Sequence, residues 1–118
     1  MKYLTVIIML WGLLMPVQAM AYDDYDSRRA GSYMKEAEYY KKKADGYRRE
    51  AAYYQKKAQG YQREASYYTK RGDIDRAKTY LRYADDAMDR YETQMRYAKD
   101  ADERAAYYLR QASRILDD

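Results

Sequence analysis

The chain has 118 residues, a formal net charge of +4, and neither Cys nor His. This length allows one small domain, and the absence of Cys excludes disulfides and thiol chemistry. Without His there is no obvious nucleophile–base pair, so we expect a non-enzymatic protein with no cofactor and no small-molecule substrate. Tyr is the main large apolar residue, since the chain contains 18 Tyr and no Phe.

The first 21 residues have the features of a secretory signal peptide. Lys2 precedes an apolar run, Leu4–Leu14, and the segment ends in the small-residue pattern Ala19-Met20-Ala21. The alternative, a membrane anchor, needs roughly 20 apolar residues to cross a bilayer, and this run is much shorter. We therefore predict cleavage after Ala19 or Ala21. The product is expected in the periplasm or the extracellular space, with no membrane span after signal cleavage.

The next segment, residues 22–30, is rich in charged residues and has no hydrophobic periodicity. Segments of this kind cannot bury enough apolar surface to offset the entropy of ordering. We therefore predict a flexible N-terminal arm over residues 22–30, followed by a helical domain over residues 31–118.

From Tyr33 onward the sequence repeats with a period of 14 residues, in blocks that begin at Tyr33, Tyr47 and Tyr61. Within each block Tyr and Ala alternate at spacings of four and three, which is the heptad pattern of a coiled coil. The pattern predicts a first helix over about residues 31–71, with Ala and Tyr along one face.

Gly72 and Asp73 interrupt this helix. Gly is the usual residue just past a helix end, and Asp is a strong N-cap for the helix that follows. A second helix is predicted over about residues 74–116, with the turn at 72–73. So short a turn forces the two helices antiparallel, so that the numbers of facing residues sum to about 145. The predicted fold class is all-α: an antiparallel two-helix coiled-coil hairpin with Ala/Tyr heptads.

In this register, meaning the alignment of one helix along the other, most Tyr side chains face an Ala. Large opposite small is what close packing requires, and a parallel arrangement would stack Tyr on Tyr. The predicted hairpin core consists of Tyr33, Ala37, Tyr40, Ala44, Tyr47, Ala51, Tyr54, Ala58, Tyr61, Ala65, Tyr68, Ala77, Tyr80, Ala84, Ala87, Tyr91, Ala98, Ala101, Ala105, Tyr108, Ala112 and Ile115.

The second helix carries a further apolar row beside its Ala/Tyr face. A two-stranded coil needs only two apolar positions per heptad, so a third position indicates another partner. We predict that hairpins pair through this row into a four-helix bundle or a larger homo-oligomer. The assembly seam consists of Leu81, Met88, Met95, Leu109 and Leu116, with Asp102 interrupting it.

Charge is distributed unevenly between the two helices. Residues 31–71 contain 11 basic and 5 acidic side chains, a formal charge of +6, whereas residues 73–118 contain 9 basic and 11 acidic ones, a charge of −2. Cations next to Tyr rings offer both charge and stacking surface to a polyanion. Candidate anion contacts are Lys41, Lys42, Lys43, Arg48, Arg49, Lys56 and Lys57.

These patterns favour an exported structural or self-assembling coiled-coil protein of the cell envelope or extracellular space. The alternative function is an exported module that binds an anionic polymer (polysaccharide, lipopolysaccharide or nucleic acid) through the basic, Tyr-rich first helix. A third possibility is weak cation binding by the carboxylates of the second helix, around Asp85 and Asp100. No residue is indicated as catalytic, cofactor-binding or a specific metal ligand.

Overall fold

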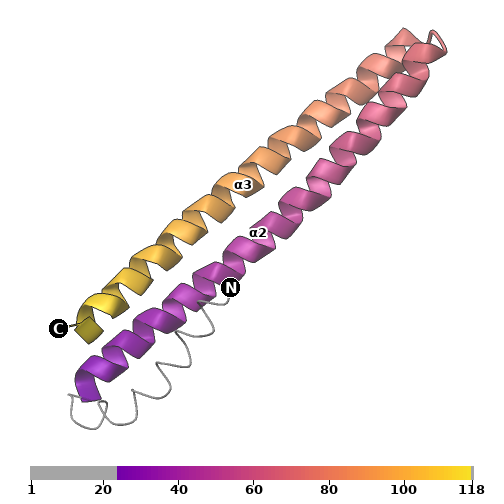
Figure 1. Cartoon of the computed structure of the whole chain (residues 1–118). Coiled ribbons are helices and arrows are strands. Elements are labelled where there is room, and N and C mark those ends of the chain that lie inside the picture. The colour runs from indigo at the N-terminus through magenta and orange to yellow at the C-terminus, as the bar shows by residue number, and fades with distance from the viewer. Residues whose placement is uncertain (1–23, 118) are drawn as a thin grey trace. The chain divides into compact units, whose positions relative to one another are not determined.

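In the computed structural model, the described residues, 24–117, form two long helices joined by a tight turn (Figure 1). Helix α2 spans Asp24–Lys70 and helix α3 spans Ile74–Asp117. Both helices belong to one antiparallel hairpin, so the predicted all-α hairpin is confirmed. The predicted signal peptide and its cleavage site lie outside the described residues.

The first helix begins earlier than the sequence pattern predicted. Residues 24–30, assigned to the predicted flexible arm, are helical, so that part of the prediction is wrong. The physical reason is Ala30, which lies seven residues before Ala37 and is buried like it. Ala30 therefore continues the apolar row by one heptad beyond Gly31 and Ser32, two residues with weak helix propensity.

The turn combines a C-terminal cap for α2 with an N-terminal cap for α3. Gly72 has φ of 82°, a left-handed conformation that is unstrained only for glycine. Its backbone N–H donates to the carbonyl of Thr69 at 3.1 Å, and the N–H of Asp73 donates to the carbonyl of Tyr68 at 2.9 Å. These two bonds form a Schellman motif. The Asp73 carboxylate in turn accepts the backbone N–H of Arg76 at 3.2 Å, which caps α3.

The chain divides into two compact units. One, Glu38–Ala105, contains the turn and the flanking parts of both helices, which run antiparallel (Figure 1). The other joins the start of α2, up to Ala37, with the end of α3, from Ala106. Within this second unit the rings of Tyr33 and Tyr108 stack at 6.0 Å. Each unit thus holds an antiparallel pair of helical segments.

Only small side chains are buried among the described residues. No large side chain there is fully enclosed, and the predicted core residues of the Tyr type, together with Ile115, are half-buried. A pair of helices buries a narrow stripe, so an Ala methyl is covered completely while one edge of a Tyr ring stays in water. The buried residues are Ala30, Ala37, Ala44, Ala51, Ala58, Ala65, Ala77, Ala84, Ala87, Ala98, Ala101, Ala105 and Ala112.

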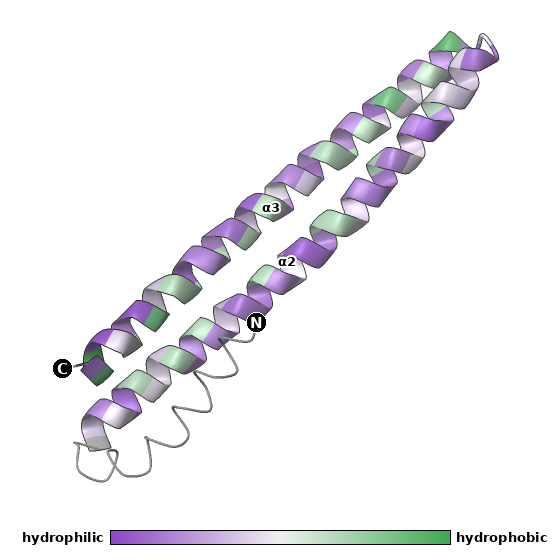
Figure 2. Cartoon of the chain, in the orientation of Figure 1, coloured by the Kyte–Doolittle hydropathy of each residue, from purple (hydrophilic) through white to green (hydrophobic). Residues whose placement is uncertain are grey.

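Hydropathy along the two helices follows the same pattern. Figure 2 shows purple hydrophilic residues along all of α2, interrupted only by pale green, whereas strongly hydrophobic residues lie near both ends of α3. Within residues 24–117, neither helix has a stretch apolar enough to span a bilayer.

Candidate binding surface of paired tyrosines and cations

Three pairs of adjacent Tyr residues recur along α2 at intervals of 14 residues. In each pair the two rings meet edge to face: Tyr39–Tyr40 at 5.1 Å, Tyr53–Tyr54 at 5.2 Å and Tyr67–Tyr68 at 5.1 Å between centroids. The first ring of each pair is about half exposed, and the second faces α3 and is half-buried. At 1.5 Å per residue, successive pairs within the helix are about 21 Å apart.

Each exposed ring carries a cation from the following turn of α2. Lys43 Nζ lies 5.3 Å from the ring centroid of Tyr39, and Lys57 Nζ lies 5.4 Å from that of Tyr53. The hydrogen bond between each ammonium and the hydroxyl of the same Tyr raises the pKa of both lysines, with a smaller electrostatic contribution. At the third pair Arg71 takes this place, 5.3 Å from the ring of Tyr67, and its Nη1 donates to the Tyr67 hydroxyl at 2.9 Å.

Each half-buried ring carries a second cation, supplied by α3. The guanidinium of Arg104 lies 5.6 Å from the centroid of Tyr40, that of Arg90 lies 5.8 Å from Tyr54, and that of Arg76 lies 5.4 Å from Tyr68. The residue numbers in each of these three pairs sum to 144, in agreement with the predicted register of about 145. A 14-residue repeat in both helices, read in opposite directions, therefore builds the same four-residue cluster three times.

Two open grooves with equivalent linings lie beside these clusters, both within the Glu38–Ala105 unit. We call them the Tyr40 groove, with a volume of about 250 Å³, and the Tyr54 groove, with a volume of about 350 Å³. The Tyr40 groove is lined by Tyr40, Lys43, Tyr47, Tyr97, Asp100, Ala101 and Arg104. The Tyr54 groove is lined by Tyr53, Tyr54, Lys57, Tyr61, Tyr83, Asp86, Ala87 and Arg90.

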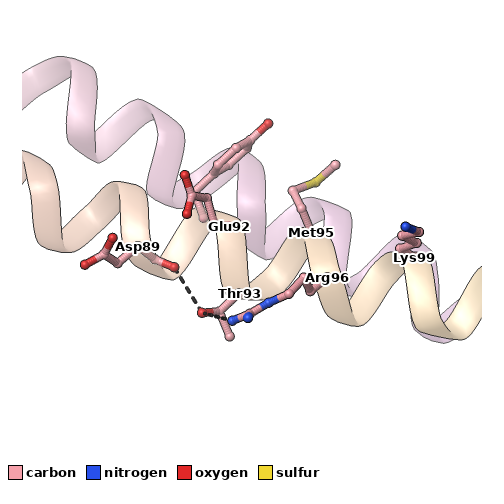
Figure 3. Close-up of a pocket in the computed structure, with 7 residues that line it drawn as sticks. Asp89, Glu92, Thr93, Met95, Arg96 and Lys99 are labelled. Carbon is pink, nitrogen blue, oxygen red and sulfur yellow. Dashed lines mark hydrogen bonds between the residues drawn. The ribbon is translucent and has the colours of Figure 1, made fainter.

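A third hollow, of about 670 Å³, lies on the surface of α3 alone. Figure 3 shows Met95 beside the charged side chains of Glu92, Arg96 and Lys99. The Thr93 hydroxyl donates to the carbonyl of Asp89 at 3.0 Å and accepts from Arg96 at 3.2 Å. All described residues around this hollow come from one helix, so we assign no binding site to it.

The predicted assembly seam is partly exposed. Leu81 is 49 % exposed, and Met95 and Leu109 are each 38 % exposed. Met88 and Leu116 are half-buried. At the interrupting position, Asp102 accepts from Arg48 Nη1 at 2.7 Å, and the same guanidinium binds Asp45 at 2.7 Å. These two carboxylates raise the pKa of Arg48, and Arg48 joins α2 to α3 on this side.

The predicted anion contacts do not gather at one place. Only Lys43 and Lys57 line the grooves. Arg48 is occupied by its two carboxylates, and Lys42 pairs with Glu38 at 3.6 Å. The remaining three, Lys41, Arg49 and Lys56, are exposed on α2 and line neither groove.

The α3 half of these clusters was missed at the level of sequence. Arg76, Arg90 and Arg104 recur at intervals of 14, as do Tyr83 and Tyr97. That repeat is visible in the second helix, but it involves residues outside the Ala/Tyr heptads on which the prediction rested. Among residues 24–117, no group of three or more acidic side chains is arranged to hold a metal ion.

Comparisons of the chain with known protein families, curated proteins and solved structures give no match.

Proposed function

We propose that this protein is an exported, non-enzymatic structural protein whose hairpins associate side by side through α3, as a coiled-coil bundle or a larger assembly. One observation carries the proposal: among the described residues, the hairpin fully buries only alanines. Burying a methyl group contributes about 0.8 kcal/mol, far less than burying a Leu or Met side chain. A single hairpin therefore has a thin core, and association would bury the larger apolar side chains.

The α3 seam is the surface best suited to this association. Within the Glu38–Ala105 unit, Leu81, Met88 and Met95 recur at heptad spacing along one flank of the helix. Arg90 and Tyr83, which line the Tyr54 groove, lie on the opposite flank, given 3.6 residues per turn. Packing α3 against α3 of a second copy would cover the seam and leave the grooves accessible.

The seam also explains why the hairpin need not form a complete core by itself. Chains of this size with a small core usually gain stability from disulfides, metals or oligomerisation. The sequence contains no Cys, which leaves self-association as the simplest source of additional burial.

Light scattering coupled to size-exclusion chromatography tests the proposal, on protein purified after expression of the full chain. The wild type is expected at a multiple of the mass of one chain at tens of micromolar. Replacing Leu81 and Met95 by Lys places two charges in the seam and should reduce the mass towards that of one chain, with helicity checked by circular dichroism. A monomeric wild type would contradict the proposal.

A matched control uses the other flank of the same helix. Tyr83 and Tyr97 lie two residues beyond Leu81 and Met95, and each is 47 % exposed. Replacing both Tyr residues by Lys should leave the oligomeric mass unchanged. If this pair dissociates the assembly as strongly as the seam pair, the α3 seam is not the interface.

A further inference from the structure

We infer that the Tyr40 and Tyr54 grooves are two equivalent binding sites for an acidic polysaccharide chain that runs along the hairpin. The two linings match residue by residue when α2 is shifted by 14 positions and α3 by 14 in the opposite direction. Lys43 corresponds to Lys57, and Arg104 corresponds to Arg90. Asp100 corresponds to Asp86 in the same way.

The side chains in the two grooves also have the same geometry. Tyr47 and Tyr97 meet at 5.4 Å with an interplanar angle of 57°, and Tyr61 and Tyr83 meet at 5.4 Å with an angle of 58°. One ring of each pair comes from α2 and the other from α3. Two sites that agree this closely, about 21 Å apart along the helix, suit a polymer with a regular repeat.

The cations in the grooves are positioned but not neutralised. Lys43, Lys57, Arg90 and Arg104 each lie over a Tyr ring. None of these four cations forms a salt bridge with a carboxylate of residues 24–117. A ring face holds a cation in place while leaving its N–H groups able to donate. Each groove therefore presents an ammonium and a guanidinium to an incoming carboxylate or sulfate.

The remaining groups suit a sugar. The carboxylates of Asp86 and Asp100, which form no salt bridge with residues 24–117, can accept hydrogen bonds from hydroxyl groups. Tyr83 and Tyr97 leave about half of their surface exposed, and the negative face of a ring attracts the C–H groups of a sugar ring. Cation, acceptor and aromatic surface together match a polymer with both acidic groups and hydroxyls.

Charge density favours polysaccharide over nucleic acid. A nucleic-acid strand carries a phosphate about every 3.4 Å, which amounts to about six charges over the 21 Å between grooves. Each groove offers two cations and also contains an Asp, whose charge would repel a dense row of phosphates. A chain with one acidic group in every one or two sugars fits this sparse pattern better.

Binding of polygalacturonate to the protein purified after expression of the full chain tests the inference, by titration calorimetry at fixed ionic strength. Dextran, which is uncharged, and oligodeoxythymidylate serve as comparison polymers. We expect polygalacturonate to bind more tightly than either. Fragments of only a few sugars should bind more weakly than long chains, since they cannot reach both grooves. Tighter binding of oligodeoxythymidylate, or equal binding of dextran, would overturn the inference.

Two matched variants show whether the grooves are responsible. Replacing Lys43, Lys57, Arg90 and Arg104 by Gln should weaken binding at least about tenfold, because charge-assisted hydrogen bonds are lost in both grooves. The control carries the same loss of charge outside the grooves and should bind as the wild type does. If it loses as much affinity as the groove variant, the inference is wrong. The control replaces by Gln the exposed residues Lys41, Lys56, Lys70 and Lys78.

A third variant separates sugar recognition from simple charge attraction. Replacing Asp86 and Asp100 by Ala removes two acceptors and two negative charges. Affinity for polygalacturonate should fall if these carboxylates bind hydroxyls, and should rise if the grooves act only as cationic patches. A rise would overturn the inference. Light scattering on each variant distinguishes loss of polysaccharide binding from loss of self-association, since the groove substitutions should leave the oligomeric mass unchanged.

Discussion

The ring of Tyr80 on α3 stacks on the ring of Tyr68 on α2, with centroids 5.6 Å apart and an interplanar angle of 8°. On its other side Tyr80 approaches Tyr61, at 6.2 Å. Ala65 lies midway between these two α2 residues in the sequence and is buried. A ring from one helix thus inserts between two rings of the other, above a methyl group, which fixes the alignment of the helices next to the turn.

This insertion predicts the behaviour of two substitutions at position 80. Tyr80→Ala should lower the free energy of unfolding by about 1–3 kcal/mol, since it removes ring contacts on both sides. Tyr80→Phe should be close to neutral because it keeps the ring. Chemical denaturation followed by circular dichroism measures both. Equal losses in the two variants would show that the hydroxyl, not the ring, is responsible.

Ala98 tests the packing of large against small side chains. It is 2 % exposed and is predicted to face Tyr47. Ala98→Leu should overpack this layer and destabilise the hairpin by about 1–3 kcal/mol. The control is Ala52→Leu, because Ala52 is exposed on the outside of α2 and Leu is nearly as good a helix former as Ala. Stabilisation by Ala98→Leu would contradict this layer structure.

Three glycines are expected to respond in opposite ways to the same substitution. A Cβ added at Gly46 or Gly60 would meet only an Arg guanidinium, at 3.9 Å. Alanine at either site should therefore raise the free energy of unfolding by about 0.5–1 kcal/mol through its helix propensity. Gly72→Ala should instead be destabilising by about 1 kcal/mol or more, because its positive φ suits only glycine. Thermal unfolding of the three variants measures these effects. Destabilisation by Gly46→Ala would indicate that a neighbour occupies the space beside it.

The raised pKa values of Lys43 and Lys57 predict a loss of stability in alkaline solution. Hydrogen bonds to Tyr39 and Tyr53 favour the charged ammonium in the folded state. This contribution is fully present below the ordinary lysine pKa of about 10.4 and is lost as pH rises through the higher folded-state value. Melting temperatures measured from neutral pH to pH 11 or so should fall less steeply when both lysines are replaced by Met. Identical profiles would show that the lysine–tyrosine contacts make no contribution.

Much of the fold could be predicted because its determinants are local or periodic. Gly72 and Asp73 specify the turn by their backbone preferences, and a short turn leaves only an antiparallel arrangement. The heptad spacing of Ala then places the buried stripe on each helix. The start of α2 was wrong because Gly31 and Ser32 interrupt the pattern, whereas the burial of Ala30 by the other helix outweighs their weak propensity.

The candidate site was predicted only in part. Lys43 and Lys57 follow from the sequence of α2, since their contacts with Tyr39 and Tyr53 lie within one helical turn. The contacts of Arg90 and Arg104 depend on how the two helices are rotated about their axes, which heptad spacing describes only coarsely. The coiled-coil assembly and the export of the protein stay predictions.

A nitroxide spin label at Met95 tests the central claim, association through the α3 seam, most directly. The chain contains no Cys, so Met95→Cys provides a single labelling site. Its control is Lys56→Cys, on the exposed outer face of α2. As protein concentration rises, the electron paramagnetic resonance spectrum should show immobilisation of the label at position 95 and continued mobility at position 56. A label at position 95 that stays mobile at every concentration, or immobilisation only at position 56, would contradict the account.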